Sequence, residues 1–221
     1  MFEGFDPEMI PFFLDLRFHN EKAFMDANRE RYQVHVRRPF CCFIEELGGL
    51  LLQHLPDLEV RPNKCLSRIN RDTRFSKDKS PYRDHLWIAF RKAGVDKDGQ
   101  PFYWFEIAPE YVSWGMGIWG ENRDLLDRMR REMIKSPEIY LKLLEQVRRA
   151  GCTVEGAVWK KMPLPDGLPA ALSILYPRRS LFFEKNGIDP ESIYSPGIVQ
   201  DVYRDYLKLM PFYQALTRCI A

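Results

Sequence analysis

The first quarter of the chain repeats apolar residues at intervals of three and four, which is the spacing of one face of a helix. The longest of these stripes covers residues 32–55 and contains Pro39, which should kink or interrupt it. Asp6-Pro7 predicts the start of an earlier helix, because proline is favoured in the first turn, and Asn20 is expected to cap a second one. We therefore expect this part of the chain to be helical.

From residue 65 onward the pattern changes to short segments that are rich in aromatic and β-branched residues and are separated by turns, as is typical of strands. Asp96-Lys97-Asp98-Gly99 is a turn sequence, so the strands on either side of it should pair as an antiparallel hairpin. The expected strands cover residues 65–70, 85–91, 102–107, 112–118, 153–158 and 181–185.

Three helices are expected after the central strands. One covers about residues 122–134, one opens at Ser136-Pro137-Glu138 and closes at Gly151, and one runs from Ser195-Pro196 to about Leu209. Helices, then a meandering antiparallel sheet, then further helices packed on it and a C-terminal helix form the pattern of an α+β fold. No linker or repeat divides the chain, so we predict a single domain over residues 1–221.

Composition places the chain among globular proteins with a sizeable core, since 45% of its 221 residues are hydrophobic. No apolar run approaches the roughly 20 residues that span a bilayer, and the N-terminus lacks the pattern of a signal peptide. We expect a cytoplasmic protein with no membrane partner. The five cysteines show no zinc-site spacing, and the sequence has no other metal-ligand set and no cofactor fingerprint, so neither a metal nor a cofactor is expected.

Charge is concentrated in one region, although the net charge of the whole chain is only +2. Residues 61–92 contain ten Lys or Arg and three Asp, an excess of seven positive charges, which leaves about −5 for the rest. Such a local field suits a phosphate-bearing or carboxylate small ligand better than indiscriminate coating of nucleic acid.

Most of this charge lies in residues 68–83, which read R-I-N-R-D-T-R-F-S-K-D-K-S-P-Y-R and should connect the first two strands. We interpret them as an anion-binding loop in which arginines grip ligand oxygens bidentately, aspartates orient the arginines, and a lysine and a tyrosine add a charge and a hydroxyl or ring. The expected ligand-binding residues are Arg68, Arg71, Asp72, Arg74, Asp78, Lys79 and Tyr82.

Two other interpretations of this region stay open. The loop could be a purely structural network, in which Asp72, Asp78 and Asp84 neutralise the arginines, although carboxylates are outnumbered there. Nucleic acid is the second alternative, because the aromatic segment at residues 102–105 could stack bases beside the basic loop. The oligomeric state also stays open.

Motifs that would define a reaction are missing from the sequence. Residues 115–120 match G-x-G-x-x-G, but a dinucleotide-binding unit needs a buried parallel strand, and this segment belongs to an antiparallel set. We expect these glycines to relieve crowding among nearby tryptophans. The candidates for a general acid or base are His85, Asp72 and Asp78, so whether the protein is an enzyme stays open.

The loop also carries a family resemblance, through R-x-x-R-D-x-R-F followed by D-K-x-x-Y. Its members here are Arg68, Arg71, Asp72, Arg74, Phe75, Asp78, Lys79 and Tyr82. Together with F-F-L-D-L-R-F-H-N-E-K near the start, R-E-R-Y-x-x-x-V-x-x-P at residues 29–39 and an aromatic segment near Trp114, this resembles a widespread bacterial family of unknown function.

The resemblance covers most of the chain and weakens after about Thr153. The chain departs from the expected pattern at His19-Asn20, in place of Asn-Asn, and at Ala23-Phe24, in place of Trp-Phe. The resemblance implies a compact bacterial domain with a shared site, and it implies no activity.

Overall fold

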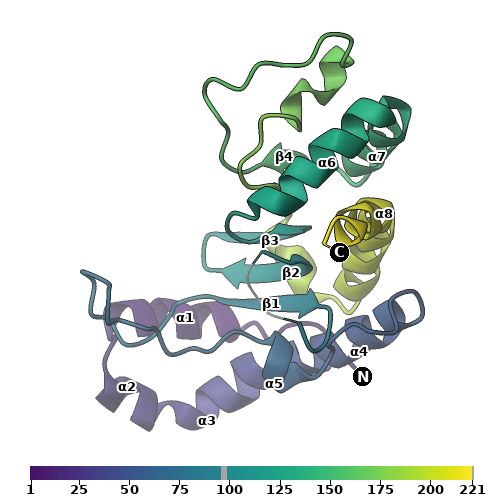
Figure 1. Cartoon of the computed structure of the whole chain (residues 1–221). Coiled ribbons are helices and arrows are strands. Elements are labelled where there is room, and N and C mark those ends of the chain that lie inside the picture. The colour runs from purple at the N-terminus through teal and green to yellow at the C-terminus, as the bar shows by residue number, and fades with distance from the viewer. Residues whose placement is uncertain (96–98, 221) are drawn as a thin grey trace. The chain divides into compact units, whose positions relative to one another are not determined.

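The computed structural model describes residues 1–95 and 99–220 and has an α+β fold (Figure 1). Five strands form an antiparallel sheet in the order β1-β2-β3-β5-β4, which confirms the predicted class. The strands are β1 (Leu86–Arg91), β2 (Pro101–Ala108), β3 (Tyr111–Ile118), β4 (Thr153–Glu155) and β5 (Phe182–Lys185). The predicted turn residues 96–98 between β1 and β2 lie outside the described residues.

Helices flank the central strands in sequence, as predicted. Before β1 come α1 (Met9–Phe18), α2 (Lys22–Ala27), α3 (Arg29–Arg31), the π-helix η1 (Tyr32–Arg37), α4 (Arg38–Leu52) and α5 (Pro62–Cys65). After β3 come α6 (Arg123–Lys135), α7 (Pro137–Arg149), the 3-10 helices η2 (Ala170–Ile174) and η3 (Pro190–Tyr194), and α8 (Ile198–Arg218).

Local signals placed α6 and α7 correctly. The side chain of Asn122 accepts a hydrogen bond from the backbone N–H of Leu125 at 3.0 Å, which satisfies one of the free donors at the start of α6. Gly151 follows α7 with a φ of 70°, the left-handed conformation that commonly ends a helix.

Two predicted strands and one predicted helix cap differ from the structure. Residues 65–70 do not form a strand, because Pro62 starts the short helix α5 and only Leu66 and Asn70 make isolated bridges. The strand predicted at 153–158 ends at Glu155, since the backbone of Gly156 has a φ of 112°. Asn20 does not cap α2, whose N-cap is Glu21.

The C-terminal helix is longer than predicted. It was expected to end near Leu209, but α8 continues to Arg218 with Pro211 inside it. Phe212 and Leu216 lie beyond the proline and are buried, so apolar packing offsets the loss of one helical hydrogen bond at this point.

The chain divides into two compact units, each made of separate segments. The first contains Met1–Phe90, Trp104–Ser113 and Gly187–Tyr203, and the second contains Arg91–Tyr103, Trp114–Asn186 and Arg204–Ala221. The single domain predicted over the whole chain stays a prediction.

The first unit has a core of phenylalanine rings. Phe105 of β2 lies 4.6 Å from Phe43 of α4 and 5.6 Å from Phe5 between ring centroids, and Phe5 also contacts Phe40 at 4.9 Å. All four rings are buried, so they hold the N-terminal segment and α4 against the strand.

The second unit has its own core, in which Tyr103 contacts Tyr206 and Tyr213 of α8 at centroid distances of 4.6 and 5.0 Å. β3 and β5 pair there with Gly117 opposite Phe182. A Cβ at position 117 would lie 2.3 Å from the Cβ of Phe182, so glycine is required by the approach of β5, and the close neighbour is not a tryptophan.

Candidate ligand pocket and the arginine-rich loop

The arginine-rich loop is closed by a short antiparallel stem in the first unit. Leu66 bridges Ile88, and Asn70 bridges Tyr82. The backbone N–H of Arg71 donates to the carbonyl of Pro81 at 2.8 Å, and the N–H of Arg83 donates to that of Ile69 at 2.8 Å. The stem therefore fixes both ends of the loop. Its tip, residues 72–80, lies beyond the backbone hydrogen bonds that join the two sides of the stem.

Arg83 braces this stem from the side. Its guanidinium donates to the backbone carbonyls of Arg68 at 3.2 Å and Asn70 at 2.6 Å, and it lies 4.9 Å from the ring centre of Trp87. Partial burial and then the charge of Arg71 lower the pKa of Arg83. The group acts as a hydrogen-bond donor within the protein rather than as an exposed charge.

A second brace comes from Asn20, before α2. Its side-chain amide accepts from the backbone N–H of Tyr82 at 2.9 Å and donates to the carbonyl of Tyr82 at 3.0 Å. Asn20 is therefore used to hold the loop stem and not to cap a helix.

Four of the predicted site residues pair with one another at the loop tip. Arg71 bonds Asp78, and Arg74 holds Asp72 through Nε–Oδ1 and Nη2–Oδ2 contacts of 2.9 and 2.6 Å. Hydrogen bonds from the Arg74 side chain and backbone lower the pKa of Asp72 to about 2.

Lys79 and Asp78 also make local contacts. The Lys79 ammonium donates to the carbonyl of Thr73 at 2.9 Å, and Asp78 accepts from the hydroxyl and backbone N–H of Ser80 at 2.7 and 2.9 Å. Bonds from Ser80 and then Arg71 lower the pKa of Asp78. The tip thus has the local ion-pair network that the structural interpretation describes, although exposed pairs of this kind add little stability.

The side chains of Arg68, Lys77 and Phe75 do not take part in this network of ion pairs and hydrogen bonds. Within residues 1–95 and 99–220 no ion pair or hydrogen bond involves the side chain of Arg68 or of Lys77. Phe75 is 95% exposed, with the Arg74 guanidinium 5.8 Å from its ring centre.

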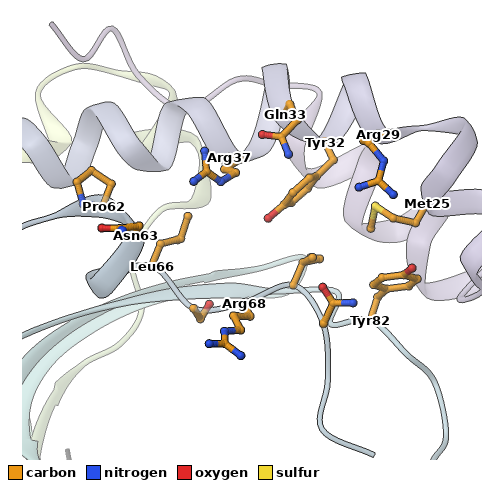
Figure 2. A pocket seen from close by; sticks show the side chains of 13 residues that line it. Met25, Arg29, Tyr32, Gln33, Arg37, Pro62, Asn63, Leu66, Arg68 and Tyr82 are labelled. Atoms are coloured by element: carbon orange, nitrogen blue, oxygen red, sulfur yellow. The ribbon is translucent and has the colours of Figure 1, made fainter.

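A pocket of about 350 Å³ lies beside the stem in the first unit, within the size range of small-ligand sites (Figure 2). One wall is helical and is formed by Met25, Arg29, Tyr32, Gln33 and Arg37. The lining contains three arginines and no Asp or Glu.

The facing wall comes from a later part of the chain. It consists of Pro62 and Asn63 of α5, residues 66–70, and Tyr82. Of the predicted site residues, Arg68 and Tyr82 therefore line the pocket, while the ion-paired residues of the loop tip do not.

The helical wall contains the π-turn η1, which follows from the position of Pro39. Proline has no N–H, and its ring crowds the carbonyl four residues before it. The backbone N–H of Arg38 bonds instead to the carbonyl of Gln33, five residues earlier, so the helix widens for one turn and then continues as α4. The predicted interruption at Pro39 is thus a local widening of a continuous helix.

The three pocket arginines differ in their partners. Arg29 contacts Asp26 at 2.7 Å in an exposed ion pair. The side chains of Arg37 and Arg68 have no hydrogen-bond or salt-bridge partner in the part of the chain that the structure describes. Figure 2 shows Arg29 and Arg37 on opposite sides of Tyr32, and Arg68 on the facing wall with its guanidinium turned away from the helix.

Two tyrosines supply rings and hydroxyl groups to the pocket. Tyr32 and Tyr82 are each 8% exposed. Burial raises the pKa of Tyr32 to about 12, so its hydroxyl is neutral near pH 7 and available as a donor.

His85, proposed as a general acid or base, lies outside the pocket lining. Its Nδ1 is 3.0 Å from Asp84 and its Nε2 is 3.8 Å from Glu106. Arg17 also bonds Asp84, at 2.5 Å, and forms a two-point ion pair with Glu110. Burial raises the pKa of Asp84, but the bonds from His85 and Arg17 outweigh it and leave this pKa lowered.

Sequence reasoning missed most polar residues of the pocket, among them Arg29, Gln33, Arg37 and Asn63. Two signals pointed to the first three. Arg29 and Tyr32 belong to the segment R-E-R-Y-x-x-x-V-x-x-P on which the family resemblance partly rests, and a proline inside a helical stripe often marks a local irregularity. Nothing in the local sequence singled out Asn63.

Comparison with known proteins identifies the family of this chain. The family described as conserved hypothetical protein (DUF2461) matches residues 8–214, and the chain belongs to it. This confirms the resemblance drawn from the signature of the loop. No curated protein and no solved structure matches the chain.

None of the helices in the described part of the chain is both long and apolar enough to cross a membrane. In the same part of the chain no group of three or more His, Cys, Asp or Glu side chains is arranged to hold a metal ion.

Proposed function

We propose that this protein binds a phosphorylated or otherwise anionic small ligand in the pocket between the helical wall and the stem of the arginine-rich loop. The observation that carries the proposal is the lining itself, which has three arginines and no carboxylate in about 350 Å³. The proposal concerns binding and assigns no reaction.

Arginine is suited to this role because its planar guanidinium can make two parallel hydrogen bonds to a phosphate or carboxylate. Arg37 is half-buried and has no partner among the described residues. Keeping a cation there without a counter-charge is unfavourable, so an anionic ligand would relieve the cost.

The proposal gives different roles to different parts of the signature. Arg71, Asp72, Arg74 and Asp78 keep the loop tip together through their ion pairs. The stem, braced by Arg83 and Asn20, carries the pocket residues Arg68 and Tyr82; Tyr82 would contact the ligand as it stands, whereas the guanidinium of Arg68 is turned away from the helical wall and would have to rotate to reach it. The structural and the binding interpretations then apply to separate residues of one motif.

Nucleic-acid binding stays the alternative proposal, and one observation favours it. Phe75 is 95% exposed at the loop tip, two residues from Lys77, whose side chain has no partner in the described part of the chain, and an exposed ring beside cations can stack on an unpaired base. This alternative places the contacts at the tip rather than in the pocket.

A thermal-shift screen separates these proposals. The panel contains inorganic phosphate, pyrophosphate, sugar phosphates, nucleotides and short oligonucleotides, because a ligand that binds only the folded protein raises its melting temperature. Each hit is repeated with Arg37→Gln and with Arg38→Gln. Arg38 is the matched control, since it is exposed, lies one residue away and does not line the pocket.

A small anion whose shift is lost in Arg37→Gln and kept in Arg38→Gln supports the pocket proposal. An oligonucleotide whose shift is lost in Phe75→Ala, with Arg37→Gln unaffected, supports the alternative. If no small anion shifts the melting temperature, the pocket proposal is wrong.

A further inference from the structure

We infer that the pocket is built for a ligand with two anionic groups held apart, joined by an apolar or ring-bearing body. This inference rests on the proposed function and names the class of ligand for the same site. It follows from where the two helical arginines lie and from what separates them.

Arg29 and Arg37 are eight residues apart on one continuous helical wall. At a rise of about 1.5 Å per residue this places their backbones on the order of 10 Å apart along the helix axis. Figure 2 shows them at opposite ends of the wall with Tyr32 between them. A single phosphate group spans only a few ångströms, so it would contact one of the two arginines and not both.

The π-turn brings both ends of the wall to the same side. A π-turn holds more residues than an α-turn, because its hydrogen bonds reach five residues back. Arg37 therefore lies roughly one turn beyond Tyr32 and Gln33, and all three face the pocket together with Arg29. An uninterrupted α-helix would rotate position 37 away from position 29 by most of a quarter turn.

Figure 2 shows the ring of Tyr32 between the two arginines, projecting from the helix, with the polar side chain of Gln33 beside it. The ring is buried, and Met25 and Leu66 add apolar surface elsewhere in the lining, one from each wall. A hydrocarbon, sugar or aromatic body would cover this surface, and the polar side chains of Gln33 and Asn63 could bond to its substituents.

Neither arginine is firmly committed to another partner. Arg37 has none among the described residues, and the pair between Arg29 and Asp26 is exposed, with 65% and 46% of the two side chains accessible. Exposed pairs of this kind contribute little and exchange readily for a ligand. Two-point attachment would strengthen binding because the second contact forms within an already bound complex.

Calorimetric titration of the whole chain tests this inference with matched probes. Fructose 6-phosphate and fructose 1,6-bisphosphate differ by one distant phosphate, and adenosine 5′-monophosphate and adenosine 3′,5′-bisphosphate form a second pair. Pyrophosphate supplies two adjacent phosphates without a body. The proteins are the wild type, Arg29→Gln, Arg37→Gln and the control Arg38→Gln.

We expect a bisphosphate to bind at least about tenfold more tightly than its monophosphate partner and than pyrophosphate. Arg29→Gln and Arg37→Gln should each remove that advantage, and Arg38→Gln should retain it. If monophosphates bind as tightly as bisphosphates in an Arg37-dependent way, the two-anion inference is overturned while the proposed function stands. If no probe binds, both are overturned.

Discussion

Asn20 and Tyr82 are joined by two hydrogen bonds across 62 positions of the chain, since the side-chain amide of Asn20 donates to the carbonyl of Tyr82 at 3.0 Å and accepts from its N–H at 2.9 Å. The amide thus takes the place of a neighbouring strand for one residue of the pocket wall. The segment between α1 and α2, which contains Asn20, therefore helps to position the wall of the proposed site that contains Tyr82.

Asn20→Ala should therefore lower the free energy of unfolding by about 1–2 kcal/mol, because two partly buried backbone groups lose their partner. Urea denaturation measures this change. Asn28→Ala is the control, since the Asn28 side chain bonds the carbonyl of Phe24 one turn away and holds no distant segment among the described residues. An Asn20 variant as stable as the control, with unchanged ligand binding, would contradict the bracing role.

The sequence was informative where signals are local. Short segments rich in aromatic and β-branched residues and bounded by turns located β1, β2 and β3 to within one or two residues. Asn122 and Gly151 marked the limits of α6 and α7, because caps act within one turn. The extension of α8 past Pro211 was missed because burial overrides a local breaker, and burial depends on partners far along the chain.

The candidate site was predicted only in part, for a related reason. Arg68 and Tyr82 were singled out because they lie in a dense run of charge, and both line the pocket. Arg37 was missed because the pocket forms between two segments about 30 residues apart in sequence. The residues of the loop tip form ion pairs and the residues of the stem line the pocket. Which residue falls in which group depends on the geometry of the turns, and this geometry cannot be read from the amino-acid composition of the loop.

The carboxyl group of Asp72 should titrate far below an ordinary aspartate, near pH 2 rather than 3.8, because Arg74 donates hydrogen bonds to its charged form. The folded-state pKa is lowered, so the stabilising effect is present above about pH 4 and is lost as the pH falls through about 2. Carboxyl carbon chemical shifts followed by NMR measure the titration.

Arg74→Ala should return the pKa of Asp72 toward 3.8. Lys77→Ala is the control, because it removes one positive charge from the same loop without removing a bond to Asp72. Equal effects of the two substitutions would mean that the general field of the loop, and not the pair, lowers this pKa.

Two glycines should respond in opposite directions to alanine. Gly117→Ala should destabilise the protein by about 2–3 kcal/mol or more, since the new Cβ would lie 2.3 Å from the Cβ of Phe182 and 2.6 Å from the carbonyl oxygen of Leu181. Gly49→Ala should stabilise by about 0.5–1 kcal/mol, because a Cβ added at this exposed position of α4 would meet no described atom within 4 Å beyond its chain neighbours and the backbone of its own helix.

Thermal or urea unfolding of the two variants measures both effects. A Gly117→Ala protein as stable as the wild type would contradict the close pairing of β3 with β5. A destabilised Gly49→Ala protein would mean that this face of α4 is covered rather than open.

The hydroxyl of Tyr103 is a buried polar group with no hydrogen-bond partner among the residues that the structure describes, and its ring packs between Tyr206 and Tyr213. Tyr103→Phe should therefore leave stability unchanged or raise it by up to about 1 kcal/mol, because it removes an unsatisfied group and keeps the ring. Tyr103→Ala, which also removes the ring, should cost about 3–5 kcal/mol. A clear loss of stability in Tyr103→Phe would show that the hydroxyl has a partner.

The central claim is that the pocket arginines, and not the ion-paired arginines of the loop tip, bind the anion. NMR of the arginine side-chain Nε–Hε groups tests it most directly, with the best phosphate-bearing probe from the screen added stepwise. We predict that the resonances of Arg29 and Arg37 shift and saturate together, while those of Arg71 and Arg74 stay in place. Shifts confined to Arg71 and Arg74, or no saturating shift at any arginine, would contradict the account.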